Sequence, residues 1–147
     1  MKQSLGLIAL IIFVAGISVV LSAQDQRPGG RPLSIALSGS AEVPGPGDPD
    51  GTGQLQLTLN PGKNEVCYEL KVDQIETPTA AHIHAGIAGK SGPPVLTLTV
   101  AGKALANDCA TLDAEIIKAI LKDPSGYYVN VHNAEYPDGA VRGQLGR

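Results

Sequence analysis

Residues 54–72, QLQLTLNPGKNEVCYELKV, decide the fold class of this chain. Every second residue from 55 to 59 is leucine, and every second residue from 66 to 72 is apolar. Alternation with a period of two predicts strands that bury one face. The segment 60–64 between them contains Pro61 and Gly62, which favour a turn. The stretch therefore predicts an antiparallel β-hairpin.

The same alternation recurs along the chain. It predicts further strands over 33–37, 80–86, 95–100, 127–133 and 140–145. Proline- and glycine-rich segments separate them, and the longest, 40–53, is expected to be an exposed loop whose aspartates at 48 and 50 are solvated. A helix is predicted over 113–122, because isoleucines and a leucine form one apolar stripe there. Seven or so short strands and one short helix predict an all-β Greek-key sandwich or barrel.

The N-terminus has the pattern of a secretory signal peptide. Lys2 precedes an uncharged apolar run over 5–21, and Ser22 and Ala23 are small residues at its end. We expect cleavage after Ala23, a flexible leader over 24–32 and one domain over 33–147. The alternative is an uncleaved membrane anchor, since the apolar run is near the lower length limit for spanning a bilayer.

Charge and cysteine content narrow the class of protein. The formal net charge is −3 and the chain has no basic cluster, which argues against nucleic-acid binding and, after signal removal, against membrane association. Cys67 and Cys109 are the only cysteines. An even count in an exported chain predicts one disulfide, and the alternative is a pair of soft metal ligands. We therefore expect a secreted or periplasmic protein.

The only three histidines lie in two strand-like segments. His82 and His84 are two residues apart, so both side chains point to one face of their strand. His132 lies in the predicted strand 127–133. Three imidazoles suit copper, zinc or nickel, and copper leads the affinity order. The pattern predicts a three-histidine metal site. In the alternative, the histidines bind no metal and only form hydrogen bonds at the ends of strands.

Other polar residues are expected near these histidines. If the last two strands pair without a bulge, His132 lies near Ala140 and Asn130 near Arg142, on one polar face. Three protein ligands leave a coordination position for water, for Glu135, for Tyr128 or for a second subunit.

Four motifs resemble the CHRD domain, which is named after chordin and also occurs as a free-standing secreted bacterial protein. They are LSGSAEVP at 37–44, AHIHAG at 81–86, YYVNVHN at 127–133 and YPDGAVRGQL at 136–145. The resemblance covers about residues 33–145. It implies a β-sandwich or barrel of immunoglobulin-like or Cu,Zn superoxide dismutase-like character, and the cysteine pair fits that of many such domains.

The resemblance leaves the molecular role open. Cu,Zn superoxide dismutases also combine a His-x-His strand with further histidines and a late arginine, but this chain has no fourth histidine and no identifiable zinc-ligand loop. We expect a secreted copper-binding protein and assign no enzymatic activity, with redox chemistry of the dismutase type left open. The alternative is a metal-free extracellular module that binds a partner protein or a second copy through its sheet edges and the 40–53 loop.

Overall fold

A computed structural model describes residues 32–100 and 102–146 of the chain. The predicted signal peptide and all but the last residue of the predicted leader lie outside the described residues. Within the described part of the chain, no helix is both long enough and apolar enough to cross a membrane.

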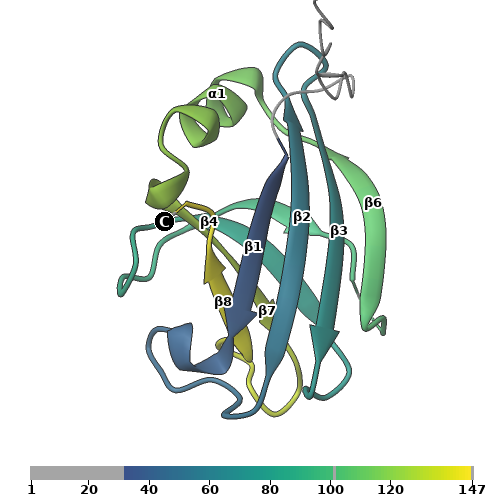
Figure 1. The fold of residues 1–147 in the computed structure, drawn as a ribbon, viewed down its shortest axis with the longest axis vertical. Coiled ribbons are helices and arrows are strands. Elements are labelled where there is room, and N and C mark those ends of the chain that lie inside the picture. Colours follow the sequence, from purple (N-terminus) through teal and green to yellow (C-terminus); the bar gives the residue numbers. More distant parts are fainter. Residues whose placement is uncertain (1–31, 101, 147) are drawn as a thin grey trace, which may run out of the picture.

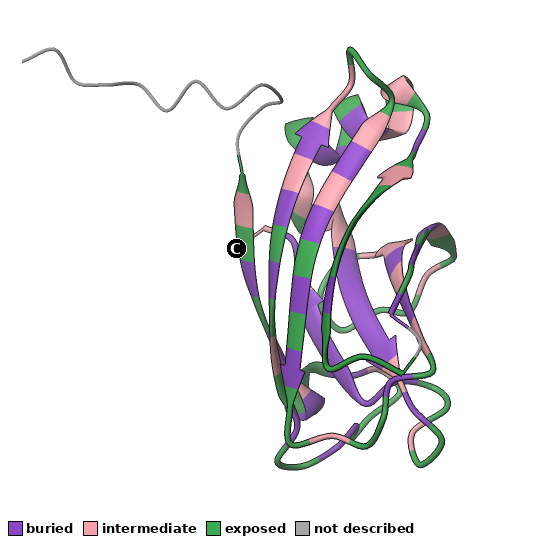
Figure 2. Ribbon diagram, turned by 90° about the vertical axis from the view of Figure 1, so that its right-hand side faces the viewer, coloured by how far each residue is buried: buried purple, intermediate pink, exposed green. Residues whose placement is uncertain are grey.

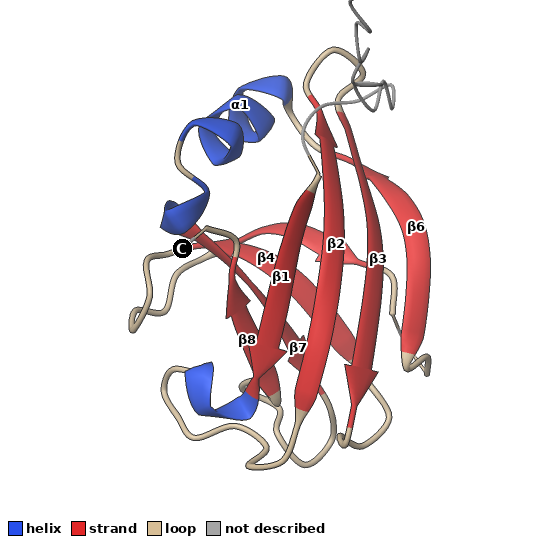
Figure 3. Cartoon of the chain, in the orientation of Figure 1, coloured by secondary structure: helices blue, strands red, loops and turns tan. Residues whose placement is uncertain are grey.

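The described residues form eight strands, one α-helix and two single turns of 3₁₀ helix (Figures 1 and 3). In chain order they are β1 (Leu33–Ser38), η1 (Gly39–Ala41), β2 (Thr52–Asn60), β3 (Glu65–Asp73), β4 (Ala80–Ala85), β5 (Pro94–Leu98), β6 (Leu105–Thr111), α1 (Ala114–Lys122), η2 (Pro124–Gly126), β7 (Tyr127–His132) and β8 (Val141–Gln144).

The eight strands form one antiparallel sheet that curls into a nearly closed barrel. Its order is β5-β4-β7-β8-β1-β2-β3-β6. The predicted hairpin is β2 and β3, paired from Thr52–Asp73 to Asn60–Glu65. The chain leaves β3 and returns as β4 beside β7 rather than beside β3, so strands distant in sequence become neighbours. This all-β architecture with one short helix confirms the predicted fold class.

The apolar residues of the alternating pattern fill the barrel. Figure 2 shows this as buried and exposed residues that alternate along the strands. Leu55, Leu57 and Leu59 of β2 are fully buried, and so are Ile83 of β4 and Val129 of β7. Burial of such side chains is worth about 1.5–3 kcal/mol each relative to exposure. The inward-facing residues of these strands are therefore apolar, which leaves the outward-facing positions available for polar side chains.

The helix covers one end of the barrel (Figure 1). Asp113 caps its N-terminus by accepting a hydrogen bond of 2.8 Å from the amide of Glu115. Ile117 and Ile120 are fully buried, whereas Leu121, at 37 % exposure, is at the rim of the predicted stripe.

Two parts of the structure differ from the sequence prediction. Strand β6 was not predicted, because its sequence LANDCAT has no apolar alternation and most of its side chains are exposed. It pairs with β3, and Cys67 lies directly opposite Cys109, where the two form the predicted disulfide. The disulfide contradicts the alternative in which the two thiols bind a metal.

The 40–53 segment is also more buried than the exposed loop that was predicted. Glu42 and Asp48 are each only 6 % exposed, so the prediction that Asp48 is a solvated turn acid was wrong. The amide of Asp48 donates to the carbonyl of Ala140, and that of Gly47 to the carbonyl of Gly39. A Cβ atom at residue 39 or 47 would overlap backbone atoms, so glycine permits this close approach. The segment folds back along β8 and brings Glu42 to the outward face of the sheet.

Candidate metal centre

The three histidines share the outward face of two neighbouring strands. Strands β4 and β7 pair antiparallel, with Ala80 opposite His132 and His82 opposite Asn130. Because Ile83 and the other odd-numbered neighbours point into the barrel, the even-numbered side chains of both strands point outward. The pairing thus gathers residues about fifty positions apart in the sequence, and each imidazole is partly buried.

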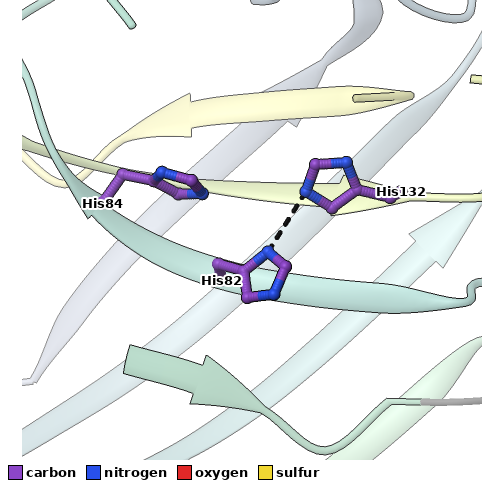
Figure 4. Close-up of side chains that lie close together, drawn as sticks. All are labelled: His82, His84 and His132. Carbon is purple, nitrogen blue, oxygen red and sulfur yellow. Dashed lines mark hydrogen bonds between the residues drawn. The ribbon is translucent and has the colours of Figure 1, made fainter. Parts of the chain in front are cut away.

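The imidazoles are close enough to share one ion (Figure 4). Nδ1 of His82 and Nε2 of His132 lie 3.2 Å apart. Ring centroids lie 5.6 Å apart for His82 and His84 and 5.1 Å apart for His82 and His132. One nitrogen from each ring lies within 4.8 Å of the other two. Two nitrogens bound tetrahedrally to one ion at about 2.0–2.1 Å are separated by about 3.3 Å, so the first pair already has ligand spacing.

Backbone carbonyls orient two of the rings. Nδ1 of His84 lies 2.8 Å from the carbonyl oxygen of Gly92, and Nδ1 of His132 lies 2.9 Å from that of Pro137. A carbonyl only accepts, so Nδ1 carries the proton in both rings, and the neutral imidazole presents a lone pair at Nε2. Metal-binding histidines in proteins are commonly oriented in this way.

Burial favours the neutral imidazoles. Desolvation, together with the charges of its two histidine neighbours, lowers the pKa of His82. Desolvation also lowers the pKa of His132, against the opposing effect of the hydrogen bond that its Nδ1 donates to the Pro137 carbonyl. Nε2 of His84 is buried and has no hydrogen-bond partner among the described residues. A buried lone pair without a partner is unfavourable, and a metal ion would satisfy it.

Tyr128 packs against His84, and Arg142 packs against Tyr128. The ring of Tyr128 is stacked on His84, and the Arg142 guanidinium lies 3.4 Å from the centre of the Tyr128 ring. Tyr128 is on β7, between β4 and β8, so the two residues approach its opposite faces. The tyrosine hydroxyl lies 3.3 Å from the amide and 3.4 Å from the carbonyl of Gly92. Tyr128 therefore packs behind His84 and contacts the carbonyl that orients it.

The other predicted neighbours occupy different places. Asn130 is 4 % exposed and pairs with Arg142 in the predicted register. Glu135 is exposed on the loop after β7 and is not among the residues grouped around the three histidines.

Two contributors were not predicted from the sequence. They are the carbonyls of Gly92 and Pro137, since backbone acceptors leave no trace in side-chain identity. Asn133 helps to place Pro137, because its Oδ1 accepts a hydrogen bond of 2.7 Å from the amide of Tyr136. Glu42, which lies beside Arg142 rather than among the histidines, was also not predicted, and its one available signal was its position in the motif at 37–44.

The CHRD-domain family model matches residues 33–145, which include all three histidines and the disulfide. The chain belongs to the CHRD-domain family. This match confirms the resemblance noted from the four motifs. No curated protein and no solved structure matches the chain. The function of this CHRD domain must therefore be argued from its own site.

Proposed function

We propose that this CHRD-domain protein is an extracytoplasmic copper-binding protein in which His82, His84 and His132 hold the ion. The observation that carries the proposal is the carbonyl-oriented pair, His84 and His132, whose Nε2 lone pairs face the same small volume as His82. Histidines that only form hydrogen bonds at strand ends would not need to bring three rings together.

The ligand set favours copper over the other candidates. Imidazole binds copper, zinc and nickel, and copper is the tightest in the order of divalent affinities. Three protein ligands leave a position for water or for a group from a partner. Such an open position suits storage or delivery of copper to another extracytoplasmic protein or to a second copy of the chain, and no catalytic step is assigned to it.

The sequence supports an extracytoplasmic location. The N-terminal residues have the signal-peptide pattern, and the Cys67–Cys109 disulfide is of the kind that persists in oxidising compartments. The loaded metal would therefore come from outside the cytoplasm.

The test is a copper titration of protein purified without an affinity tag. We expect one equivalent of copper to bind and to raise the melting temperature, because a ligand that binds only the folded state stabilises it. The variant His82→Ala/His84→Ala should lose both effects. Glu135→Gln is the matched control, since Glu135 is exposed near His132, and it should bind copper like the unmodified protein.

Competition with zinc and nickel decides the identity of the metal. Preferential retention of zinc at equal concentrations would overturn the assignment of copper but not the proposal of a metal site. Protein that binds none of these ions, with an unchanged melting temperature, would overturn the site. The outcome would then favour a metal-free binding module.

A further inference from the structure

A pocket lies between the 40–53 segment and the loop after β4, and none of the three histidines lines it. It has a volume of about 290 Å³. Ser40, Ala41 and Val43 form one wall, Ala88 and Gly89 form the other, and the floor consists of Glu42 together with Arg142 and Gln144 of β8. Ala41, Ala88 and Gly89 are exposed, so the pocket opens to solvent between the two loops. The hydroxyl of Ser91 donates to the carbonyl of Val43 at 3.0 Å and ties the walls together.

Two buried charged side chains in this pocket have unpaired polar atoms. Arg142 is 2 % exposed, and its Nη2 donates to the carbonyls of Ile87 at 3.1 Å and Lys90 at 3.0 Å. Its Nη1 has no partner among the described residues, and neither does Oε1 of Glu42. The guanidinium also packs against the ring of Tyr128, 3.4 Å from its centre. A buried donor or acceptor without a partner costs about 1–3 kcal/mol, and more when it is charged.

The charge of this floor depends on Glu42. Burial raises the pKa of Glu42 to about 7, against the opposing effects of the Val43 amide, Arg142 and Asn130. Arg142, on β8, is the charged group that lowers the pKa of Glu42 through its positive charge. The other groups facing Glu42 are uncharged, namely Asn130 from β7 and Gly139 from the loop before β8. Below neutral pH the floor therefore has one unbalanced positive charge and a protonated carboxyl that can donate.

We propose that this pocket binds a small monocarboxylate, with its carboxylate on Nη1 of Arg142 and its apolar part against Ala41, Val43 and Ala88. A guanidinium is well suited to a carboxylate, and the side chains of the walls are apolar apart from the Ser40 hydroxyl. When Glu42 is ionised it competes with the ligand for Arg142, so binding above neutral pH requires Glu42 to take up a proton. The proposal does not rest on copper binding, because the pocket contains none of the three histidines.

The test uses benzoate as the probe, with the purified chain and isothermal titration calorimetry. We expect one site per chain and binding about tenfold tighter at about pH 6 than at about pH 8, which is the ratio of protonated Glu42 at those two values. Benzyl alcohol has the same ring without the charge and should not bind. Inorganic phosphate that bound as tightly as benzoate would overturn the monocarboxylate assignment in favour of a general anion site.

Three variants separate the ligand site from a structural ion pair. Glu42→Gln mimics the protonated acid, so it should bind benzoate equally at both pH values. Arg142→Gln should abolish binding, with circular dichroism used to confirm its fold. Ala88→Leu fills the pocket from an exposed loop, so it should abolish benzoate binding while keeping the melting temperature. Undiminished binding by Ala88→Leu, or no binding by Glu42→Gln at either pH, would overturn the proposal.

Discussion

The imidazole of His84 lies flat against the ring of Tyr128, with 4.7 Å between the ring centroids and 8° between the ring planes. This contact fixes the plane of the one histidine whose Nε2 is buried without a partner. Orientation of a ligand ring by its neighbours typically changes metal affinity by about 10- to 100-fold.

Replacement of Tyr128 should therefore weaken copper binding without removing a ligand. We expect Tyr128→Leu to lower copper affinity by about 10- to 100-fold, because the stack is lost. Tyr128→Phe keeps the stack and loses only the long hydroxyl contacts to Gly92, so its affinity should stay within about threefold. Competition titration against a chelator measures the copper affinity of both variants. Equal losses in the two variants would assign the effect to the hydroxyl rather than to the ring.

Glu42 should make the folded state less stable as the pH rises towards neutrality. Its pKa is about 7 in the folded protein against an ordinary value of 4.5, so the folded state binds the proton more tightly than the unfolded chain. Its stabilising contribution is complete below about pH 4.5 and is lost as the pH rises through about 7. The loss amounts to about 3 kcal/mol.

Urea unfolding of the unmodified protein and of Glu42→Gln, at several pH values, measures this contribution. The difference between the two proteins isolates the contribution of Glu42 from the contributions of the other ionisable groups. A difference that stays constant from about pH 4.5 to about pH 8 would contradict the prediction.

Gly139 should tolerate no side chain. Its φ is +143°, and a Cβ at this position would overlap the carboxylate of Glu42. We expect Gly139→Ala to lower the free energy of unfolding by about 1–3 kcal/mol through strain at this backbone conformation and through displacement of Glu42. Adding Glu42→Ala should recover part of the loss, because the overlap is removed. A double-mutant cycle by urea unfolding measures the coupling, and strict additivity would exclude the contact as the cause.

The disulfide should stabilise the fold without affecting the metal site. Cys67 and Cys109 are separated by 42 positions, so the bond contributes about 4 kcal/mol in the chain-entropy model. We expect Cys67→Ala/Cys109→Ala to lower the urea midpoint and to speed amide exchange in β6, which pairs only with β3 on the described sheet. Copper stoichiometry should be unchanged, since the three histidines come from β4 and β7 and neither of these strands pairs with β6.

Local patterns were enough to predict seven strands, the helix and the Asn130–Arg142 register. Strand β6 was missed because an exposed edge strand needs no apolar face, and its pairing is stabilised by the backbone and the disulfide. The 40–53 segment was misjudged because its glycines permit tight packing as readily as flexibility.

The candidate site was predicted only in part. Alternation placed His82 and His84 on one face, but nothing local in the sequence indicates that β4 lies beside β7. The carbonyls of Gly92 and Pro137 could not be predicted either, because any residue supplies the same backbone oxygen.

The pairing of β4 with β7 also bears on the stage of folding at which the three histidines could hold an ion. In the unfolded chain His132 is some fifty residues from the other two histidines, and only the His82–His84 pair is available as a weak chelate. The three imidazoles come together only after the barrel has formed, so an ion that needs all three would bind the folded chain and not the unfolded one.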